Sequence, residues 1–249
     1  MIVIRKRVLL FVFCAAAVLL LVLPVIVSRD IAVNAKVREI PIYSVEKNEN
    51  KVSITFDCAW GADDIPIILN TLKEKNVKAT FFLVGSWIEK NEEETRMIAE
   101  QGHDVANHSK NHFKMGVLGK EKVRSEIIDC GKLIEEITGK KTDLFRAPYG
   151  DYNDTVLTVA RQEGYYNIQW SLDSLDWKPG ITEEGILSRI ENAKSGDILL
   201  FHNDTANTAK ILGRVIDILK EKGLNPVPVS ELIIRENFDI RHDGRQYKK

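Results

Sequence analysis

Apolar runs of strand length alternate with amphipathic stretches between residues 51 and 229. In the first of these stretches, Ile68, Leu69 and Leu72 recur at the spacing of one helix face. Strands that alternate with helices are typical of parallel β/α units, so we expect a parallel sheet flanked by helices. The strand-like runs occupy residues 51–56, 79–84, 103–107, 143–146, 166–172, 197–201 and 225–229.

The length of this alternating region limits the architecture. It ends near residue 234, and the enclosed stretch is short for an eightfold barrel, which typically has about 250 residues. We therefore predict an α/β fold, a distorted and incompletely closed (β/α)7 barrel over residues 51–234; a flat doubly wound sheet is the alternative. Residues 28–50 lack periodicity and are interpreted as a linker, and residues 235–249 as a charged, frayed tail.

The first 27 residues predict a membrane segment. Residues 1–7 include three basic side chains, and residues 8–27 carry no charge. Twenty apolar residues can span a hydrocarbon core of about 30 Å, and the preceding positive charge favours a cytoplasmic N-terminus. We expect a single-pass transmembrane anchor with residues 51–234 extracytoplasmic. The alternative is a signal peptide cleaved near Val33-Asn34-Ala35, which would give a secreted protein.

Charge and cysteine content exclude two classes of protein. The formal net charge is −1, so no overall basic excess suggests a nucleic-acid partner. Three cysteines are too few for a disulfide framework. A chain with 44% hydrophobic and 29% charged residues is expected to form an ordinary globular core.

Candidate chemistry stands where three strand-like runs end. Asp57 follows residues 52–56, His202 follows residues 198–201, and His108 and His112 follow the run at 103–107. The carboxyl ends of parallel strands are where such folds place their active sites. Two imidazoles four residues apart fall on one face of a helical turn and can bind one metal ion. Taken singly, each residue also has a structural explanation, such as a helix cap, a surface pair or a buried histidine.

Two further stretches supply partners for these groups. Arg146 begins an Arg-Ala-Pro-Tyr-Gly run, and its planar guanidinium can hold a carboxylate or form a structural salt bridge. Asp176 and Trp177 lie in a stretch rich in acids and indoles. A carboxylate near His202 would raise the pKa of the imidazole, which suits a general acid. An exposed tryptophan at a strand end suits stacking on a sugar.

Together these runs resemble the polysaccharide deacetylase family, which is also known as the NodB-homology domain or carbohydrate esterase family 4. The resemblance extends over about residues 50–234, and five motifs occur in the family's order. The motifs are Thr55-Phe56-Asp57, His108-Ser109-x-x-His112, Arg146-x-Pro148-Tyr149, Asp173-Ser174-Leu175-Asp176-Trp177 and Leu200-x-His202.

The resemblance implies an acid–base mechanism. Asp57 would be the general base that activates water, and Arg146 would orient it. His202 would be the general acid that protonates the leaving amine, and Asp176 would tune its pKa.

The resemblance also implies a metal and a binding pocket. His108 and His112 would bind a divalent metal, usually zinc, which would polarise the amide carbonyl. The backbone N–H of Tyr149 would help to hold the oxyanion. Trp177 and Leu200 would line the pocket for the acetyl group.

One position departs from the family pattern. The family usually has a second aspartate after the base, and that residue ligates the metal; here the position is Cys58. A thiolate can bind zinc, but Cys58 can equally be a small buried hydrophobe. Asp63 or Asp64 can reach the site, although capping the next helix is the simpler role. In this departure the chain resembles a subgroup of the family that is associated with sporulation in Gram-positive bacteria.

These observations predict an exported, membrane-anchored hydrolase that removes acetyl groups from amino sugars of an extracytoplasmic polysaccharide. Peptidoglycan is the expected substrate, because an anchored enzyme outside the membrane faces it, and a chitin-type oligosaccharide is second. The competing hypothesis is a non-catalytic protein that binds cell-wall glycan through a degenerate metal site. Cys58 is the residue that keeps this alternative open.

Overall fold

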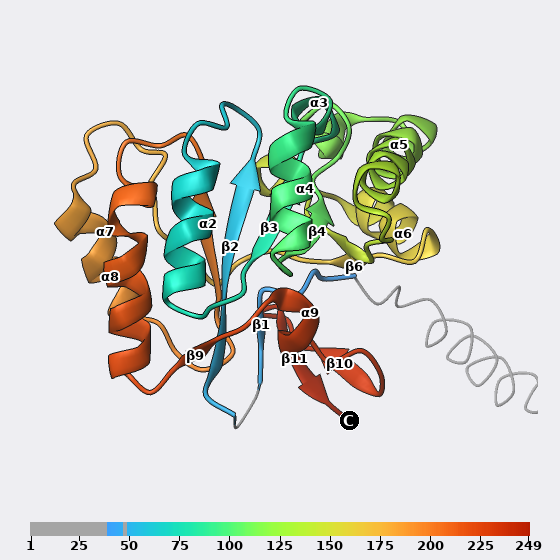
Figure 1. The fold of residues 1–249 in the computed structure, drawn as a ribbon. Helices are drawn as coiled ribbons and strands as arrows, with labels where there is room; N and C mark the ends of the chain where they lie inside the picture. Colours follow the sequence, from blue (N-terminus) through green and yellow to red (C-terminus); the bar gives the residue numbers. More distant parts are fainter. Residues whose placement is uncertain (1–38, 47–48) are drawn as a thin grey trace, which may run out of the picture. The chain divides into compact units, whose positions relative to one another are not determined.

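A curved sheet of parallel strands is the frame of the region that the computed structural model describes, residues 39–46 and 49–249 (Figure 1). Its strands follow the order β6-β5-β4-β3-β2-β8-β7, and β9 pairs with β2. Every pairing in this sheet is parallel, as the alternating pattern predicts. The strands are β2 (Lys51–Cys58), β3 (Thr80–Leu83), β4 (Asp104–Asn107), β5 (Leu144–Phe145), β6 (Tyr166–Asn167), β7 (Leu172–Asp173), β8 (Ile198–His202) and β9 (Asn225–Pro226).

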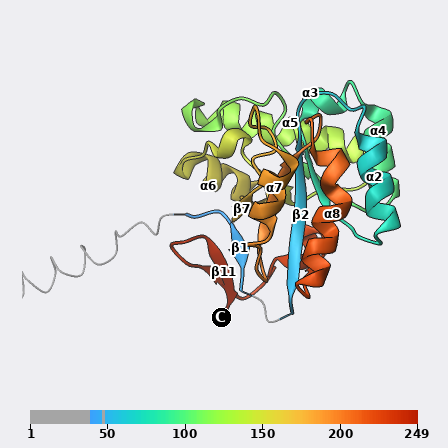
Figure 2. The ribbon, with the colours of Figure 1, turned by 90° about the vertical axis from the view of Figure 1, so that its left-hand side faces the viewer.

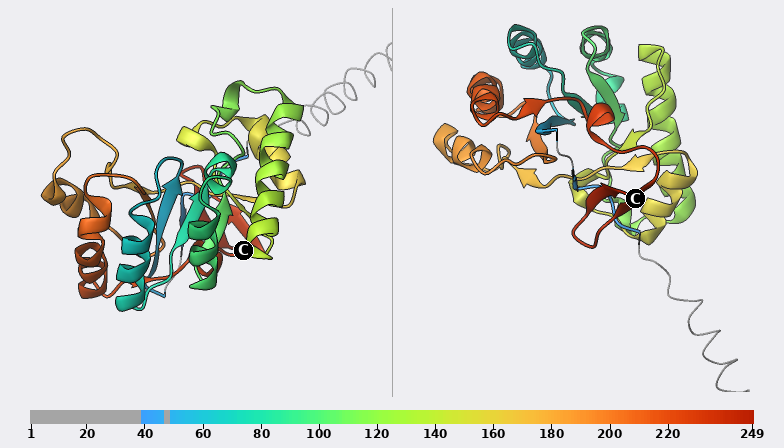
Figure 3. Two further views of the ribbon diagram at one scale, coloured as in Figure 1. Left: turned by 45° about the horizontal axis from the view of Figure 1, so that its top comes forward. Right: turned by 90° about the horizontal axis from the view of Figure 1, so that it is seen from below.

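Helices connect the strands and form an arc outside them, which is clear from below (Figure 3, right). Two of the helices begin at the residues best suited to cap them. The side chain of Asn153 accepts a hydrogen bond from the Val156 N–H, and that of Thr182 accepts one from the Gly185 N–H. The helices are α2 (Ile65–Glu74), α3 (Gly85–Ile88), α4 (Glu92–Glu100), α5 (Lys120–Thr138), α6 (Asp154–Gln162), α7 (Glu183–Ile190), α8 (Thr208–Glu221) and α9 (Val229–Leu232), with 3-10 turns η1 (Met115–Val117) and η2 (Pro148–Gly150).

The sheet curls strongly enough to bring its two edges close together. β6 and β7 are the two ends of the strand order, yet only residues 168–171 separate them in sequence. A fully extended segment of this length spans at most about 18 Å, so the edges cannot lie further apart. This geometry confirms an incompletely closed barrel of seven parallel strands and excludes a flat sheet. The single strand predicted at residues 166–172 is therefore wrong, since it is two short strands on opposite edges.

A second, three-stranded sheet joins both ends of the described chain (Figure 2). β1 (Ser44–Val45) pairs with β11 (Arg245–Lys248), which also pairs with β10 (Phe238–Ile240). The expectation of a frayed tail is wrong, because Gln246 is fully buried and its side chain bonds both backbone groups of Ile234. Part of the expected linker is likewise structured.

The described part of the linker contributes to the barrel. Ile42 is buried and forms a bridge with Ile168 in the segment between the two edges of the large sheet. Ser44 bridges to Asp197 just before β8. These residues lack the periodicity of a longer strand, so the sequence pattern did not identify them.

The alternation of side chains along β2 separates core from cavity. Ile54, Phe56 and Cys58 belong to the main hydrophobic cluster, together with residues of the outer helices. Thr55 and Asp57 point to the other face, where Thr55 Oγ1 donates a hydrogen bond of 2.7 Å to the Leu199 carbonyl. The inner face of β2 is consequently polar, and it directs Asp57 into the barrel.

Within residues 39–46 and 49–249, none of the helices combines the length and apolar character needed to cross a bilayer. The membrane segment expected at residues 8–27 lies outside the described residues.

Candidate active site

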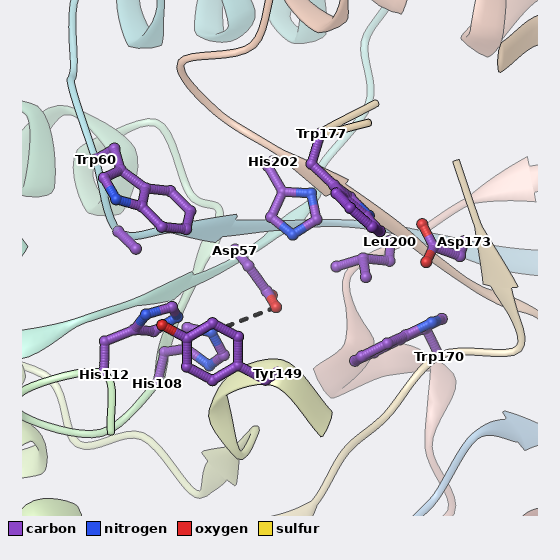
Figure 4. A pocket seen from close by; sticks show the side chains of 11 residues that line it. Asp57, Trp60, His108, His112, Tyr149, Trp170, Asp173, Trp177, Leu200 and His202 are labelled. Atoms are coloured by element: carbon purple, nitrogen blue, oxygen red, sulfur yellow. Dashed lines mark ion pairs between the residues drawn. The ribbon is translucent and has the colours of Figure 1, made fainter. Parts of the chain in front are cut away.

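A cavity of about 420 Å³ opens where the strands of the large sheet end (Figure 4). The residues that line it come from the ends of β2, β4, β7 and β8 and from the adjoining loops. Most residues singled out in the sequence therefore meet at one place, as the strand-end argument predicts. The lining residues are Asp57, Ala59, Trp60, His108, His112, Tyr149, Trp170, Asp173, Trp177, Leu200 and His202.

Asp57 is a buried carboxylate at the centre of this cavity. Its Oδ1 accepts a hydrogen bond of 2.6 Å from Arg146 Nη1, and its Oδ2 lies 3.4 Å from His108 Nε2. Burial raises the pKa of Asp57, but the charge of Arg146 and the neighbouring His108 and His202 outweigh it, so the net pKa is lowered. Asp57 is therefore ionised at neutral pH, with Oδ2 facing the cavity.

Arg146 is held within the barrel by contacts from several strands and loops. The side chain is fully buried, and besides Asp57 it donates to Thr55 Oγ1 at 2.9 Å and to the Gln169 carbonyl at 3.1 Å. Its guanidinium lies 4.0 Å from the centre of the Phe82 ring. A group fixed in this way cannot swing away from Asp57. Phe82 and Gln169 were not identified from the sequence, because nothing in a buried strand or a turn marks them as neighbours of an arginine.

His108 has a defined tautomer. Its Nδ1 lies 2.8 Å from the backbone carbonyl of Arg146, and a carbonyl oxygen can only accept, so Nδ1 carries the proton. Nε2 is then the atom with a free lone pair, and it faces Asp57. Burial lowers the pKa of His108 and outweighs the nearby carboxylate. His108 is therefore a neutral imidazole.

His112 lies beside His108, with ring centroids 5.1 Å apart. Burial and His108 lower the pKa of His112 to about 4. The helical turn expected for this pair is wrong, because Ser109 and His112 have positive φ angles of 66° and 57°. The loop is instead held by side chains: Asn107 Oδ1 accepts from the Ser109 N–H, and Ser109 Oγ accepts from the His112 N–H. The turn still brings the two rings together.

The two histidines have the properties of metal donors. Both are neutral, and the anchored Nδ1–H of His108 is the arrangement that usually orients a metal-ligating histidine. Cys58 does not join them, since it is fully buried in the main hydrophobic cluster and burial raises its pKa well above the ordinary value. Asp64 does not line the cavity: its Oδ2 accepts the backbone N–H of Asp204, and its Oδ1 is buried without a hydrogen-bond partner among the described residues. Within the described ranges, no group of three His, Cys, Asp or Glu side chains is arranged to hold a metal. The described residues thus bring together two neutral imidazoles, which are donors that a divalent metal accepts, and they add no third protein donor.

His202 is paired with Asp176 on the other side of Asp57. His202 Nδ1 lies 2.8 Å from Asp176 Oδ1, and the His202 N–H donates to Asp176 Oδ2 at 2.7 Å. Thr208 Oγ1 donates to the same Oδ2 at 2.6 Å. Burial lowers the pKa of His202, but the bond and charge of Asp176 raise it further, and the net pKa lies above its ordinary value. His202 is thereby biased towards the protonated form.

The rim of the cavity is aromatic. Trp60, Tyr149 and Trp177 are exposed. Tyr149 has a positive φ of 60°, and the centroid of its ring lies 4.5 Å from that of His112. Leu200 is buried in the cavity floor. Trp60 was not identified as a site residue from the sequence. The sequence does not show whether a tryptophan that follows a strand is buried in the core or exposed at a cavity.

A family model and a curated relative both match this chain, and both belong to the same family. The model of the polysaccharide deacetylase family matches residues 44–168. A peptidoglycan-N-acetylglucosamine deacetylase from Bacillus cereus is 35% identical over 198 residues, which cover 77% of this chain and 92% of that protein.

Similar solved structures include a wild-type pseudoenzyme of carbohydrate esterase family 4 from Bacillus anthracis. It has a TM-score of 0.75 and 32% identity, and the match covers 84% of this chain and 73% of that chain. A mutant of the same pseudoenzyme with restored enzymatic activity has a TM-score of 0.74 and 35% identity, covering 77% and 70%. This fold thus occurs in both active and inactive proteins.

Proposed function

Because the chain belongs to the polysaccharide deacetylase family, we propose that it hydrolyses N-acetyl groups of amino sugars in an extracytoplasmic polysaccharide, with peptidoglycan as the substrate. One observation carries this proposal: Asp57 and His202 face one cavity, each with a fixed partner that favours its ionised form. Amide hydrolysis needs a base to activate water and an acid to protonate the amine. The relative from Bacillus cereus supports peptidoglycan as the substrate class.

Asp57 is assigned as the general base. Its Oδ1 is held by Arg146, so Oδ2 is the atom that takes a proton from the attacking water. The water oxygen then bonds to the acetyl carbonyl carbon, and a tetrahedral oxyanion forms. The backbone N–H of Tyr149 is assigned to stabilise that oxyanion.

His202 is assigned as the general acid. Asp176 holds its Nδ1, which leaves Nε2 to give a proton to the amine nitrogen. The carbon–nitrogen bond breaks as this proton arrives, and the products are acetate and a free amine. Without the proton, an amine anion would have to leave, which is very unfavourable. Trp177 and Leu200 are assigned to contact the acetyl group.

His108 and His112 would hold the divalent metal, with zinc as the expected ion. When bound there, it supplies a Lewis acid for the acetamide carbonyl oxygen. Both imidazoles are neutral and have a lone pair available for a metal, because the pKa values of His108 and His112 are lowered.

Acetate release tests the proposal directly. The full chain is incubated with purified peptidoglycan and with oligomers of N-acetylglucosamine, and acetate and new free amines are measured together. We expect both products in equal amounts from the wild type. Acetate release without new amines would indicate an O-acetyl esterase and would contradict the proposal.

A second candidate function is binding of cell-wall glycan without catalysis. Two observations favour it: Cys58 lies in the core rather than at the metal position, and a pseudoenzyme of this family is 32% identical. The Asp57–Arg146 and His202–Asp176 pairs argue against this second function, because glycan binding alone does not require them. Tight glycan binding with no acetate from any substrate, at any zinc concentration, would make this second function the better account.

We further propose that residues 8–27 anchor the protein in the membrane, with residues 51–234 on the extracytoplasmic side. The apolar length and the preceding basic residues support this placement. Protease accessibility on intact cells tests the side, and N-terminal sequencing of the mature protein separates an anchor from a cleaved signal. Production during spore formation would support the sporulation-associated subgroup.

A further inference from the structure

One buried carboxylate, that of Glu126, supports the loop that carries His112. Glu126 lies near the start of α5, and its side chain is 1% accessible. Its Oε2 accepts a hydrogen bond of 2.8 Å from the Asn111 backbone N–H, and its Oε1 accepts one of 2.9 Å from Asn111 Nδ2. Glu126 therefore holds the residue immediately before His112 by its backbone and by its side chain. The proposed reaction does not use this carboxylate directly.

Glu126 is ionised although it is buried. Burial raises its pKa, but the hydrogen bonds from Lys122 and Asn111 outweigh that effect, and the net pKa is lowered. Lys122 Nζ lies 2.8 Å from Oε1, and half of the lysine side chain is exposed. An ionised carboxylate in the interior loses free energy when its oxygens are left without donors. The contact between Glu126 and Asn111 is therefore expected to be rigid.

The loop needs support because part of its backbone is unfavourable. Ser109 and His112 have positive φ angles, which a residue with a Cβ atom disfavours. Backbone N–H groups at the start of α3 donate to the carbonyls of Ser109 and Lys110, and these bonds fix the first half of the loop. The two bonds to Asn111 hold the second half, directly before His112.

The rings of the two histidines are held in different ways. His108 Nδ1 is anchored on the Arg146 carbonyl. The ring of His112 packs against three other rings, those of Trp60, His108 and Tyr149. Apolar packing is less directional than a hydrogen bond. The placement of the His112 ring therefore depends on the backbone of its loop.

We propose that Glu126 is a positioning residue of the metal side, which fixes the backbone before His112 so that both imidazoles face the same metal ion. This inference rests on the proposed function, which assigns His108 and His112 to the metal. Because the described residues add no third protein donor, the relative placement of the two imidazoles determines more of the affinity.

Zinc titration of the full chain tests this inference. Glu126→Leu keeps a side chain of similar size and removes both acceptors. We expect it to weaken zinc binding by about tenfold, as is usual when a residue that orients a metal ligand is lost. Glu126→Gln is the conservative variant. Its Oε1 can accept from the Asn111 N–H, and its Nε2 can donate to the Asn111 amide oxygen once that amide turns over. Zinc affinity should then return to within about twofold of the wild type.

Two further variants separate positioning from stability. Ile134→Ala is the matched control, because Ile134 is a buried residue further along α5 that packs in the main hydrophobic cluster. It should lower the melting temperature and leave zinc affinity unchanged. Asn111→Ala, at an exposed position, removes only the bond from the Asn111 side chain. It should fold as the wild type does and bind zinc about threefold less tightly.

Unchanged zinc affinity in Glu126→Leu and Asn111→Ala would overturn the inference, and so would equal losses of affinity in Glu126→Leu and Ile134→Ala. A Glu126→Gln protein as weak as Glu126→Leu would overturn it too, because the effect would then belong to the negative charge. A wild type that binds no zinc has the same consequence. Failure of the proposed function gives a different pattern, in which zinc affinity depends on Glu126 but the wild type releases no acetate from any glycan.

Discussion

The acid–base side of the cavity and the histidine side are supported differently. Asp57 is held by Arg146 and His202 by Asp176, each through a short hydrogen bond from a distant segment of the chain. His108 and His112 instead come from one short loop, and of the two only His108 is itself tied to a distant segment, through the Arg146 carbonyl; Cys58 at the adjacent family position faces the core. The acid–base geometry is therefore built into the barrel, and the metal geometry depends on fewer residues.

This difference shows how the two sides can change separately. Residue 58 lies on the face of β2 opposite to Asp57 and packs with the outer helices. Cysteine at this position gives the metal side no third donor and leaves the Asp57–Arg146 pair in place. Retention of the acid–base pairs is thus no evidence for tight metal binding, and the two properties must be measured independently.

The largest expected effect is on turnover, through Asp57. Asp57→Asn removes the base, and we expect acetate release to fall by roughly 10²–10⁴-fold with little change in glycan affinity. Asparagine keeps an oxygen that can accept from Arg146, so the circular dichroism spectrum should persist. Release of acetate at the wild-type rate would remove Asp57 from its assigned role.

Arg146 should matter most for stability. Arg146→Met leaves the carboxylate of Asp57 buried without its cation, and breaking such a pair costs about 3–5 kcal/mol of the free energy of unfolding. The control is Arg161→Met, which breaks a largely exposed pair with Glu39 and should cost within about 1 kcal/mol. Urea unfolding of the three proteins measures both. Equal costs would show that the buried pair does not stabilise the barrel.

Much of the barrel could be predicted from hydrophobic periodicity. The runs that became β2, β3, β4 and β8 are long and buried, so their apolar pattern is unambiguous. The helices α3 and α4 and the strands β1, β10 and β11 were missed. The helix α3 and the three strands have too few positions to show a period, and the nine-residue helix α4 buries only Thr95 and Ile98, so it lacks a continuous apolar face.

The candidate site shows the same division. Asp57, His108 and His202 could be predicted because strand ends converge in a parallel sheet. Phe82 and Thr208 could not, since their roles arise from contacts with Arg146 and Asp176 across the barrel. The sequence also placed the two histidines on a helical turn, whereas left-handed residues in a loop bring them together.

The pH profile tests whether the two partners tune the acid–base pair. Activity requires ionised Asp57, whose pKa is lowered, so the acid limb should lie below the ordinary 3.8 of an aspartate. It also requires protonated His202, whose pKa is raised, so activity should fall as the pH rises through a value above the ordinary 6.5. Thr208→Val removes a hydrogen bond to Asp176 that competes with the His202 imidazolium for the same carboxylate, and it should move the alkaline limb upward. Rates of kcat/KM against pH measure these limbs, and an alkaline limb below pH 6.5 would contradict the role of Asp176.

The smallest expected effect concerns Cys58 and separates its two roles. Because its side chain packs in the core, Cys58→Ser should leave zinc affinity unchanged while lowering the free energy of unfolding by ~1–3 kcal/mol, the cost of burying a hydroxyl. Calorimetric titration with zinc measures affinity, and the His108→Ala/His112→Ala protein is the control that should lose binding. Weaker zinc binding in Cys58→Ser would assign the thiolate as a ligand. The metal side would then have three protein donors, and the contrast with the acid–base side would disappear.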